Sequence, residues 1–220
     1  KSTIMTKKQR FKNVMNWFEH NTESAETELH YANNYQLLIA VILSAQCTDK
    51  RVNMISPRVF EAFPTPEVMA ESSPDEVFEY IKSCSYPNNK AKNLVGMAKK
   101  LVSDFNGEVP SNIDDLLTIP GVGRKTANVM LSVAFDLPAM AVDTHVFRVS
   151  NRIGLTDNSK SPLETERELV KYIPKRLLTR AHHWLILHGR YICIARKPKC
   201  EICGLKDWCR YYKINKKGEF

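Results

Sequence analysis

A lysine and an aspartate near the middle of the chain have types and spacing that could support covalent chemistry. Lys125 directly follows a turn-forming segment, residues 119–124 with sequence I-P-G-V-G-R, and Asp143 lies eighteen positions after it. Gly121 and Gly123 allow a tight turn whose backbone N–H groups can face an anion. A lysine amine can act as a nucleophile, and a nearby carboxylate can move protons or stabilise positive charge. The pattern predicts a nucleophile and a carboxylate beside a phosphate-binding turn.

Each of these features also has a purely structural interpretation. A Gly-x-Gly turn between helices often binds nothing, and a lysine in the first turn of a helix is usually solvated. Asp143 precedes Thr144, His145 and Val146, where its side chain is well placed to cap a helix N-terminus. The residues taken one at a time leave these interpretations open, and only their combination favours a catalytic site.

Helices are the elements that must position these residues. Apolar residues recur at helical spacing almost throughout, which predicts an all-α protein of about ten helices. The run from Leu37 to Leu43 is apolar on all sides, so we expect it to form a buried helix at the centre of a domain. Helices are expected from Phe11 to His20, from Asn33 or Asn34, from about Asp49, from Ser73-Pro74 to about Lys82, from Lys90 to Phe105, from Ser111 or Asn112, near Arg124, after Asp143, after the capping-box pattern from Ser161 to Glu164, and from Ala181 to about Ile192.

Four cysteines lie close together toward the end of the chain, with the spacing C-x6-C-x2-C-x5-C. Four thiolates so close in sequence can bind one metal centre without other parts of the chain. Zinc is the generic alternative, although zinc fingers usually pair two short knuckles and only one is present here. Disulfides are disfavoured in a reducing compartment. Cys47 and Cys84 are distant in sequence and need no metal role. The four clustered residues are Cys193, Cys200, Cys203 and Cys209.

The charge of the chain is unevenly distributed. The net charge is +8, but residues 171–220 alone contain thirteen Lys and Arg against three acidic residues. Such segregation predicts an electropositive face for an anionic polymer. An anionic membrane surface is the alternative, but no amphipathic anchor supports it. No apolar run reaches about 18 residues and the first residues do not resemble a signal peptide, so we expect no membrane partner and a cytoplasmic or nuclear location.

Two segments of the chain resemble a known family. Residues 116–127 (L-x-x-I-P-G-V-G-R-K-T-A) and residues 142–149 (V-D-T-H-V-x-R-V) are similar to the endonuclease III family of helix-hairpin-helix DNA glycosylases, and so is the cysteine spacing. The resemblance extends from about Phe11 to Tyr212. It implies two helical domains with the active site in the cleft between them. These are a helical barrel, residues 27–137, with the hairpin at residues 116–130, and a second domain, residues 1–26 plus 138–220, with the cluster loop at residues 193–209.

The resemblance also implies an activity. Lys125 would displace a damaged base and form a Schiff base with the sugar, while Asp143 assists, so the protein would be a bifunctional DNA glycosylase and AP lyase. Its substrates would be duplex DNA with oxidised pyrimidines or abasic sites, cut on the 3′ side by β-elimination. The four clustered cysteines would hold a [4Fe–4S] cluster. A monomer in the bacterial cytoplasm, near the nucleoid, is implied, with the nucleus as the alternative.

DNA contacts are implied at several further positions. Residues 43–49 (L-S-A-Q-C-T-D) look like the family's strand-penetrating segment, in which Gln46 would fill the gap left by a flipped nucleotide. A second wedge usually comes from a Gly-Leu-Tyr-Asn loop. This chain departs from that pattern with S-Y-P-N at residues 85–88, so Tyr86 becomes the expected wedge. The remaining expected contacts are Gly121, Val122, Gly123, Arg124, Arg148, Arg196, Lys197 and Lys199.

Two other functions are compatible with parts of the sequence. An adenine-mismatch glycosylase would share the fold and the iron–sulfur loop, but that subfamily usually lacks a lysine at position 125 and has a glutamate in the first penetrating segment. A non-catalytic helix-hairpin-helix module would explain the two glycines and the basic segment. It would leave the combination of Lys125 and Asp143 unexplained.

Overall fold

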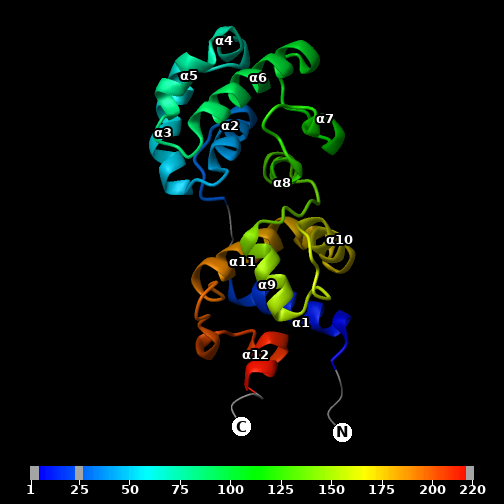
Figure 1. Ribbon diagram of the computed structural model, residues 1–220. Coiled ribbons are helices and arrows are strands. Elements are labelled where there is room, and N and C mark those ends of the chain that lie inside the picture. The colour runs from blue at the N-terminus through cyan, green and yellow to red at the C-terminus, as the bar shows by residue number, and fades with distance from the viewer. Residues whose placement is uncertain (1–4, 23–26, 217–220) are drawn as a thin grey trace. The chain divides into compact units, whose positions relative to one another are not determined.

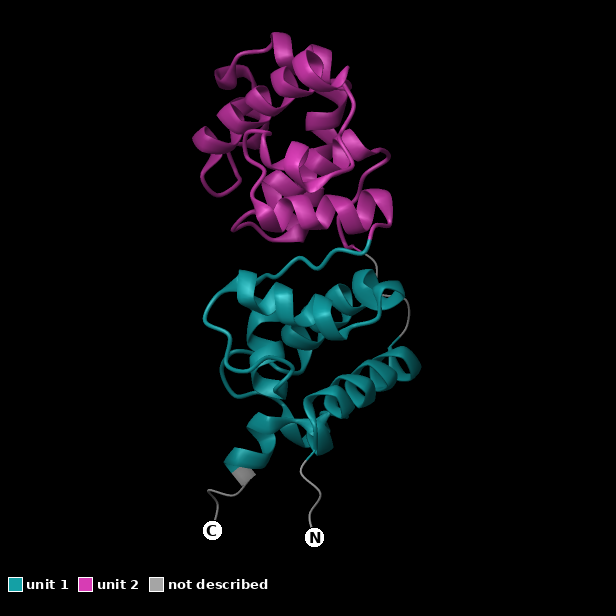
Figure 2. Cartoon of the chain, turned by 90° about the vertical axis from the view of Figure 1, so that its right-hand side faces the viewer, with its two compact units in different colours: residues 1–26, 138–220 teal, residues 27–137 magenta. Residues whose placement is uncertain are grey.

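The computed structural model describes residues 5–22 and 27–216, and all regular secondary structure in these two ranges is helical. The prediction of an all-α fold is therefore confirmed. The chain divides into two compact units, one made of residues 1–26 and 138–220 and the other of residues 27–137 (Figures 1 and 2). None of the described helices has both the length and the hydrophobicity needed to cross a bilayer.

The unit formed by residues 27–137 is built around one apolar helix. Residues Leu37 to Leu43 of α2 are between 0 and 6% exposed, and α2 contacts α3, α6, α8 and η1. α6 runs along α4 and α5 (Figure 1). The predicted central helix is thus confirmed. The helices of this unit are α2 (Asn34–Ser44), α3 (Asp49–Ala62), α4 (Pro66–Glu71), α5 (Pro74–Ile81), α6 (Pro87–Phe105), α7 (Ile113–Leu117), α8 (Arg124–Val129) and the π-helix η1 (Met130–Ala134).

Local capping residues set most of these boundaries. Thr48 and Ser73 cap α3 and α5 through their side chains, as Asn33 caps α2. The expected start of α6 at Lys90 was three residues late, because proline takes its first position at Pro87. The short helix α4 was missed from the sequence. Its first position is occupied by Pro66, and the side chain of Thr65 caps it.

The other unit packs its helices around aromatic side chains. Trp184 of α11 is fully buried and stacks on Phe18 of α1 with ring centroids 5.7 Å apart. Val146 and Val149 of α9 belong to the same core. The elements are α1 (Lys7–Asn21), α9 (Thr144–Ile153), α10 (Pro162–Tyr172), η2 (Lys175–Leu177), α11 (Leu178–Tyr191), η3 (Cys200–Ile202), η4 (Lys206–Trp208) and α12 (Arg210–Lys216).

Three predictions in this unit need correction. Helix α1 begins at Lys7, four residues before the expected Phe11, because the side chain of Thr6 caps it there. The side chain of Ser161 caps α10 by accepting from the backbone N–H of Glu164 at 3.2 Å. The carboxylate of Glu164 accepts from the N–H of Lys160 instead of Ser161, so only half of the expected capping box forms. Helix α11 begins at Leu178, three residues before the expected Ala181, because the 3₁₀ turn η2 leads directly into it.

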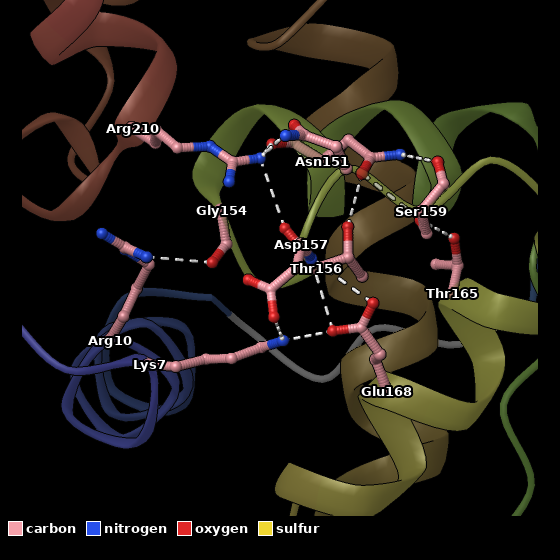
Figure 3. A network of polar contacts seen from close by, with 11 residues as sticks. Lys7, Arg10, Asn151, Gly154, Thr156, Asp157, Ser159, Thr165, Glu168 and Arg210 are labelled. Atoms are coloured by element: carbon pink, nitrogen blue, oxygen red, sulfur yellow. Dashed lines mark hydrogen bonds and ion pairs between the residues drawn. The ribbon is translucent and has the colours of Figure 1, made fainter.

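A polar network fixes the end of α9 (Figure 3). Lys7 of α1 forms ion pairs with Asp157 and Glu168. Arg10 of α1 and Arg210 of α12 donate to carbonyl groups at the C-terminal end of α9 and just beyond it, where unpaired carbonyls favour cations. The network therefore holds the helix whose first turn follows Asp143. The acceptors are Gly154 for Arg10, and Asn151 and Thr156 for Arg210.

Candidate functional site

The backbone conformation of the turn between α7 and α8 requires one of its two glycines. Gly121 has φ +81°, a left-handed conformation that favours glycine. A Cβ there would also lie 2.9 Å from Cβ of Asn93 on α6, so the turn packs closely on that helix. Val122 is buried, and its N–H donates to the carbonyl of Ile119 at 3.0 Å. These contacts make the turn a rigid part of its unit.

The second glycine of the turn is not required by the fold. Gly123 has an extended backbone with φ −90°, and no atom lies within 4 Å of the position that a Cβ would occupy. Any residue could adopt this conformation without a clash. The absent side chain instead leaves an open surface directly before α8. Arg124 and Lys125, the first two residues of that helix, are both exposed beside it.

Asp143 caps the helix that follows it in the other unit. Its Oδ1 accepts a hydrogen bond from the N–H of Val146 at 2.8 Å, and its side chain is half-buried. The preceding residues, 139–142, are buried, and the carbonyl of Ala141 is bonded by Nδ1 of His182 at 2.9 Å. The backbone is therefore well anchored on both sides of the carboxylate. Lys125 lies in the unit of residues 27–137, and Asp143 lies in the unit that includes residues 138–220.

Arg148 has a structural task. Its guanidinium donates to the carbonyl groups of Cys193 at 3.1 Å and Gly189 at 2.9 Å, and it also contacts His145 and Thr144. These contacts join α9 to the start of the cysteine loop, so Arg148 has a structural role beside the DNA contact expected from the sequence.

The four clustered cysteines line one cavity at the end of α11. Burial raises the pKa of the Cys203 thiol to about 11, and it also raises the pKa values of Cys200 and Cys209. Thiols buried in this way become thiolates when a metal centre replaces their protons. Four thiols around one cavity are the donor set that an iron–sulfur cluster requires.

Two residues around this cavity were not predicted from the sequence. Arg152 of α9 donates to Sγ of Cys193 at 3.6 Å and to the carbonyl groups of Ile194 and Ala195. Nε2 of His188 lies 3.5 Å from Sγ of Cys203, and burial lowers the pKa of His188 to about 4, so the ring is neutral. Hydrogen bonds to ligand sulfurs tune an iron–sulfur centre. Arg152 follows Arg148 by four positions, a helical spacing that could have indicated a shared face.

The cysteine loop is fastened to the core and presents cations outward. A Cβ on Gly204 would collide with the ring of Trp17, so the loop packs tightly on α1. Arg196, Lys197 and Lys199 are exposed on the loop between the first two cysteines. Their charges therefore face solvent from a segment whose shape the cysteines determine.

Gln46 and Tyr86 lie on two neighbouring turns of the other unit. Gln46 is exposed with φ +54°, and Tyr86 is 62% exposed with φ +53°. The hydroxyl of Ser85 donates to the carbonyl of Gln46 at 2.5 Å, which brings the two turns into contact. Lys90, another residue with a role that the sequence did not reveal, lies buried beneath both turns.

Comparison with known proteins agrees with this arrangement. Residues 39–175 match the family described as HhH-GPD superfamily base excision DNA repair protein, and residues 193–209 match the iron-sulfur binding domain of endonuclease III. Endonuclease III of Rickettsia felis is 51% identical over 195 residues, covering 89% of this chain and 91% of that protein. Endonuclease III of Escherichia coli is 43% identical over 207 residues, covering 94% and 97%.

Solved structures of such relatives contain DNA. A non-covalent endonuclease III–DNA complex matches with a TM-score of 0.91 and 43% identity, over 97% of this chain and all of that one. A trapped endonuclease III–DNA covalent intermediate matches with a TM-score of 0.87 over the same shares. The predicted [4Fe–4S] cluster and DNA as the partner are thereby confirmed. The chain belongs to the HhH-GPD superfamily of base excision DNA repair proteins, as a DNA glycosylase and AP lyase of the endonuclease III family.

Proposed function

We propose that this glycosylase removes oxidised pyrimidines from duplex DNA, with Lys125 as its nucleophile and Asp143 as the assisting carboxylate. The observation that carries the proposal is the position of Lys125, exposed in the first turn of α8 directly after the open surface at Gly123. A phosphate held at that surface would bring a sugar within reach of the amine. Asp143 is held by a helix cap that uses Oδ1, which leaves Oδ2 to interact with the sugar.

The chemistry follows from these two groups. The neutral amine of Lys125 attacks C1′, the bond from C1′ to the base breaks, and its electron pair leaves with the base, which takes up a proton. Asp143 stabilises the positive charge that develops at the sugar. Loss of the Lys125 proton and opening of the sugar ring leave a Schiff base. Loss of a proton from C2′ then expels the 3′ phosphate by β-elimination, and water releases Lys125.

The α7–α8 turn would hold the DNA backbone near the reacting sugar. Its glycines and the exposed Arg124 lie where N–H groups and a cation can meet phosphate oxygens. The buried Val122 fixes the shape of the turn. Contacts of this kind position the duplex without reading its sequence, as expected for an enzyme that searches any DNA for damage.

The two glycines of this turn are expected to respond oppositely to substitution by alanine. Gly121→Ala places a side chain at φ +81° against Asn93 and should lower the free energy of unfolding by about 1 to 2 kcal/mol or more. Gly123→Ala should leave stability unchanged and weaken duplex binding by about tenfold, a loss of about 1.4 kcal/mol. Thermal unfolding and fluorescence anisotropy measure the two effects. Unchanged DNA binding by Gly123→Ala would place the phosphate contact elsewhere.

Gln46 and Tyr86 would enter the duplex when the damaged nucleotide leaves it. The amide of Gln46 can donate and accept, so it can pair with an orphaned base of any identity. The ring of Tyr86 can stack on a neighbouring base. Both side chains are exposed on adjacent turns, so they can act on one gap.

The cluster loop would contact the phosphate backbone of the DNA. The bound cluster supplies a rigid shape to the loop, and the cations Arg196, Lys197 and Lys199 would neutralise phosphates. Arg152 and His188 would support the ligand sulfurs from the protein side.

We propose that the protein is a monomer. We place it in the bacterial cytoplasm, where the chromosome lies, because the relatives named above are bacterial.

A panel of duplexes, each with one defined lesion, tests this proposal. Thymine glycol and dihydrouracil should be excised and the strand cut, and borohydride should trap a covalent protein–DNA adduct by reducing the Schiff base. Adenine opposite 8-oxoguanine should remain intact. Excision of that adenine without a trapped adduct would instead identify an adenine-mismatch glycosylase, and binding without any cleavage would identify a DNA-binding module.

A further inference from the structure

Lys90 is a buried lysine whose polar partners are neutral. It is 5% exposed. Its Nζ donates to the carbonyl groups of Leu43 and Ala45, both at 2.7 Å, and lies 3.4 Å from the hydroxyl of Ser85. Burial lowers the pKa of Lys90 below its usual value. An ammonium that replaces its water shell by neutral oxygens is costly to bury, and the geometry of those oxygens indicates what the residue achieves.

The partners of Lys90 come from two turns that are distant in sequence. Leu43 and Ala45 lie at the C-terminal end of α2, where unpaired carbonyls attract a cation and where the chain turns toward Gln46. Ser85 lies directly before Tyr86 in the turn that leads into α6. One ammonium therefore holds the end of α2 and the start of α6 together.

Direct contacts between the same two turns support this arrangement. The Ser85 hydroxyl donates to the carbonyl of Gln46 at 2.5 Å. Sγ of Cys47 lies 3.7 Å from Sγ of Cys84, so the two turns are also in van der Waals contact. Gln46 and Tyr86 both have a left-handed backbone, which residues other than glycine adopt only when their surroundings impose it. Lys90 is the charged group at the centre of those surroundings.

We propose that Lys90 is a positioning residue that holds Gln46 and Tyr86 at one fixed spacing for joint entry into the DNA duplex. The inference rests on the DNA contacts proposed above for these two side chains. Extruding an intact base breaks its stacking and pairing, and inserted side chains must compensate for that loss. If the Tyr86 ring and the Gln46 amide moved independently, both would be correctly placed in the same distorted duplex less often. Lys90 thus acts through Gln46 and Tyr86 and does not touch the substrate.

The positioning role predicts a selective defect. A damaged base must be extruded before it is excised, whereas a preformed abasic site has no base to extrude. Loosening the two turns should therefore slow base excision far more than β-elimination at an abasic site. A loss of global stability would lower both rates by the same factor.

Lys90→Met tests the inference, because methionine fills the buried space without a charge or donor. Single-turnover excision of dihydrouracil should slow by about 10- to 100-fold, the range expected for a small misplacement of reacting groups. Cleavage at a preformed abasic site should change by less than about threefold. Lys92→Met, an exposed lysine on the same helix, is the matched control and should leave both rates unchanged.

A double-mutant cycle with Gln46→Ala shows whether Lys90 acts through the penetrating side chains. In the Gln46→Ala background, Lys90→Met should slow the excision of dihydrouracil by a clearly smaller factor than it does in the wild type. Full additivity, or equal loss of both activities in proportion to the unfolded fraction, would overturn the inference and leave Lys90 as a structural residue only.

The inference stays testable if Lys90→Met does not fold. Ser85→Ala removes the hydroxyl that connects Lys90 to the Gln46 carbonyl at a partly exposed position, and it should give the same selective defect to a smaller extent. Equal rates for Ser85→Ala and wild type would then count against the inference. Failure of the proposed function is distinguishable, because the wild type itself would then not excise dihydrouracil.

Discussion

Lys125→Gln is expected to abolish base excision, strand cleavage and borohydride trapping. Glutamine has no basic amine, so neither the bond to C1′ nor the Schiff base can form. The side chain is exposed at the start of α8, so the substitution should not disturb folding. The damaged duplex should still bind within about tenfold, because at most one phosphate contact is lost. Denaturing gels of single-turnover reactions measure cleavage and adduct, and anisotropy measures binding.

A matched control separates loss of the nucleophile from loss of charge. Lys99 is an exposed lysine on α6 with no proposed role, so Lys99→Gln should cleave and trap like the wild type. An adduct that forms at the wild-type rate in Lys125→Gln would assign the nucleophile to another amine. Loss of binding together with loss of cleavage would show that Lys125 acts mainly on the phosphate backbone.

Asp143→Asn is expected to slow base excision by about 10²-fold or more while the protein remains folded. Asparagine caps helices about as well as aspartate, and its Oδ1 can still accept from the Val146 N–H. The negative charge that stabilises the sugar in the transition state is lost. Loss of such a group typically lowers the rate of the chemical step by about 10²- to 10⁴-fold. Single-turnover excision rates and thermal unfolding provide the two measurements.

Alanine at the same position distinguishes the two roles of Asp143. Asp143→Ala removes both the charge and the cap, so it should add a stability loss of about 1 kcal/mol to the catalytic defect. If instead Asp143→Asn excises at the wild-type rate and only the alanine variant loses stability, Asp143 is a helix cap and the assisting carboxylate lies elsewhere.

Local sequence features determined much of the fold and of the candidate site. Side-chain caps such as Asn33 and Ser73 and the first-position proline of α5 act over three or four residues, so helix starts could be predicted from them. The apolar run of α2 has no polar face and had to be buried. The cysteine loop is equally local, because its four ligands need little more than their own spacing to enclose a cluster.

Contacts between distant segments determined what the sequence could not predict. Arg148 holds the start of the cysteine loop through acceptors that lie 41 and 45 residues later in the chain, a role that its place in the sequence does not reveal. No sequence pattern predicts the partners of Arg152 and Lys90. Arg152 contacts the cysteine loop and Lys90 contacts the end of α2 only once the chain has folded. Chemistry that depends on neighbours in sequence could thus be predicted from residue types and spacing. The roles of Arg148, Arg152 and Lys90 depend instead on which carbonyl groups and thiols the packed helices bring next to each side chain. Only the tertiary structure decides those contacts.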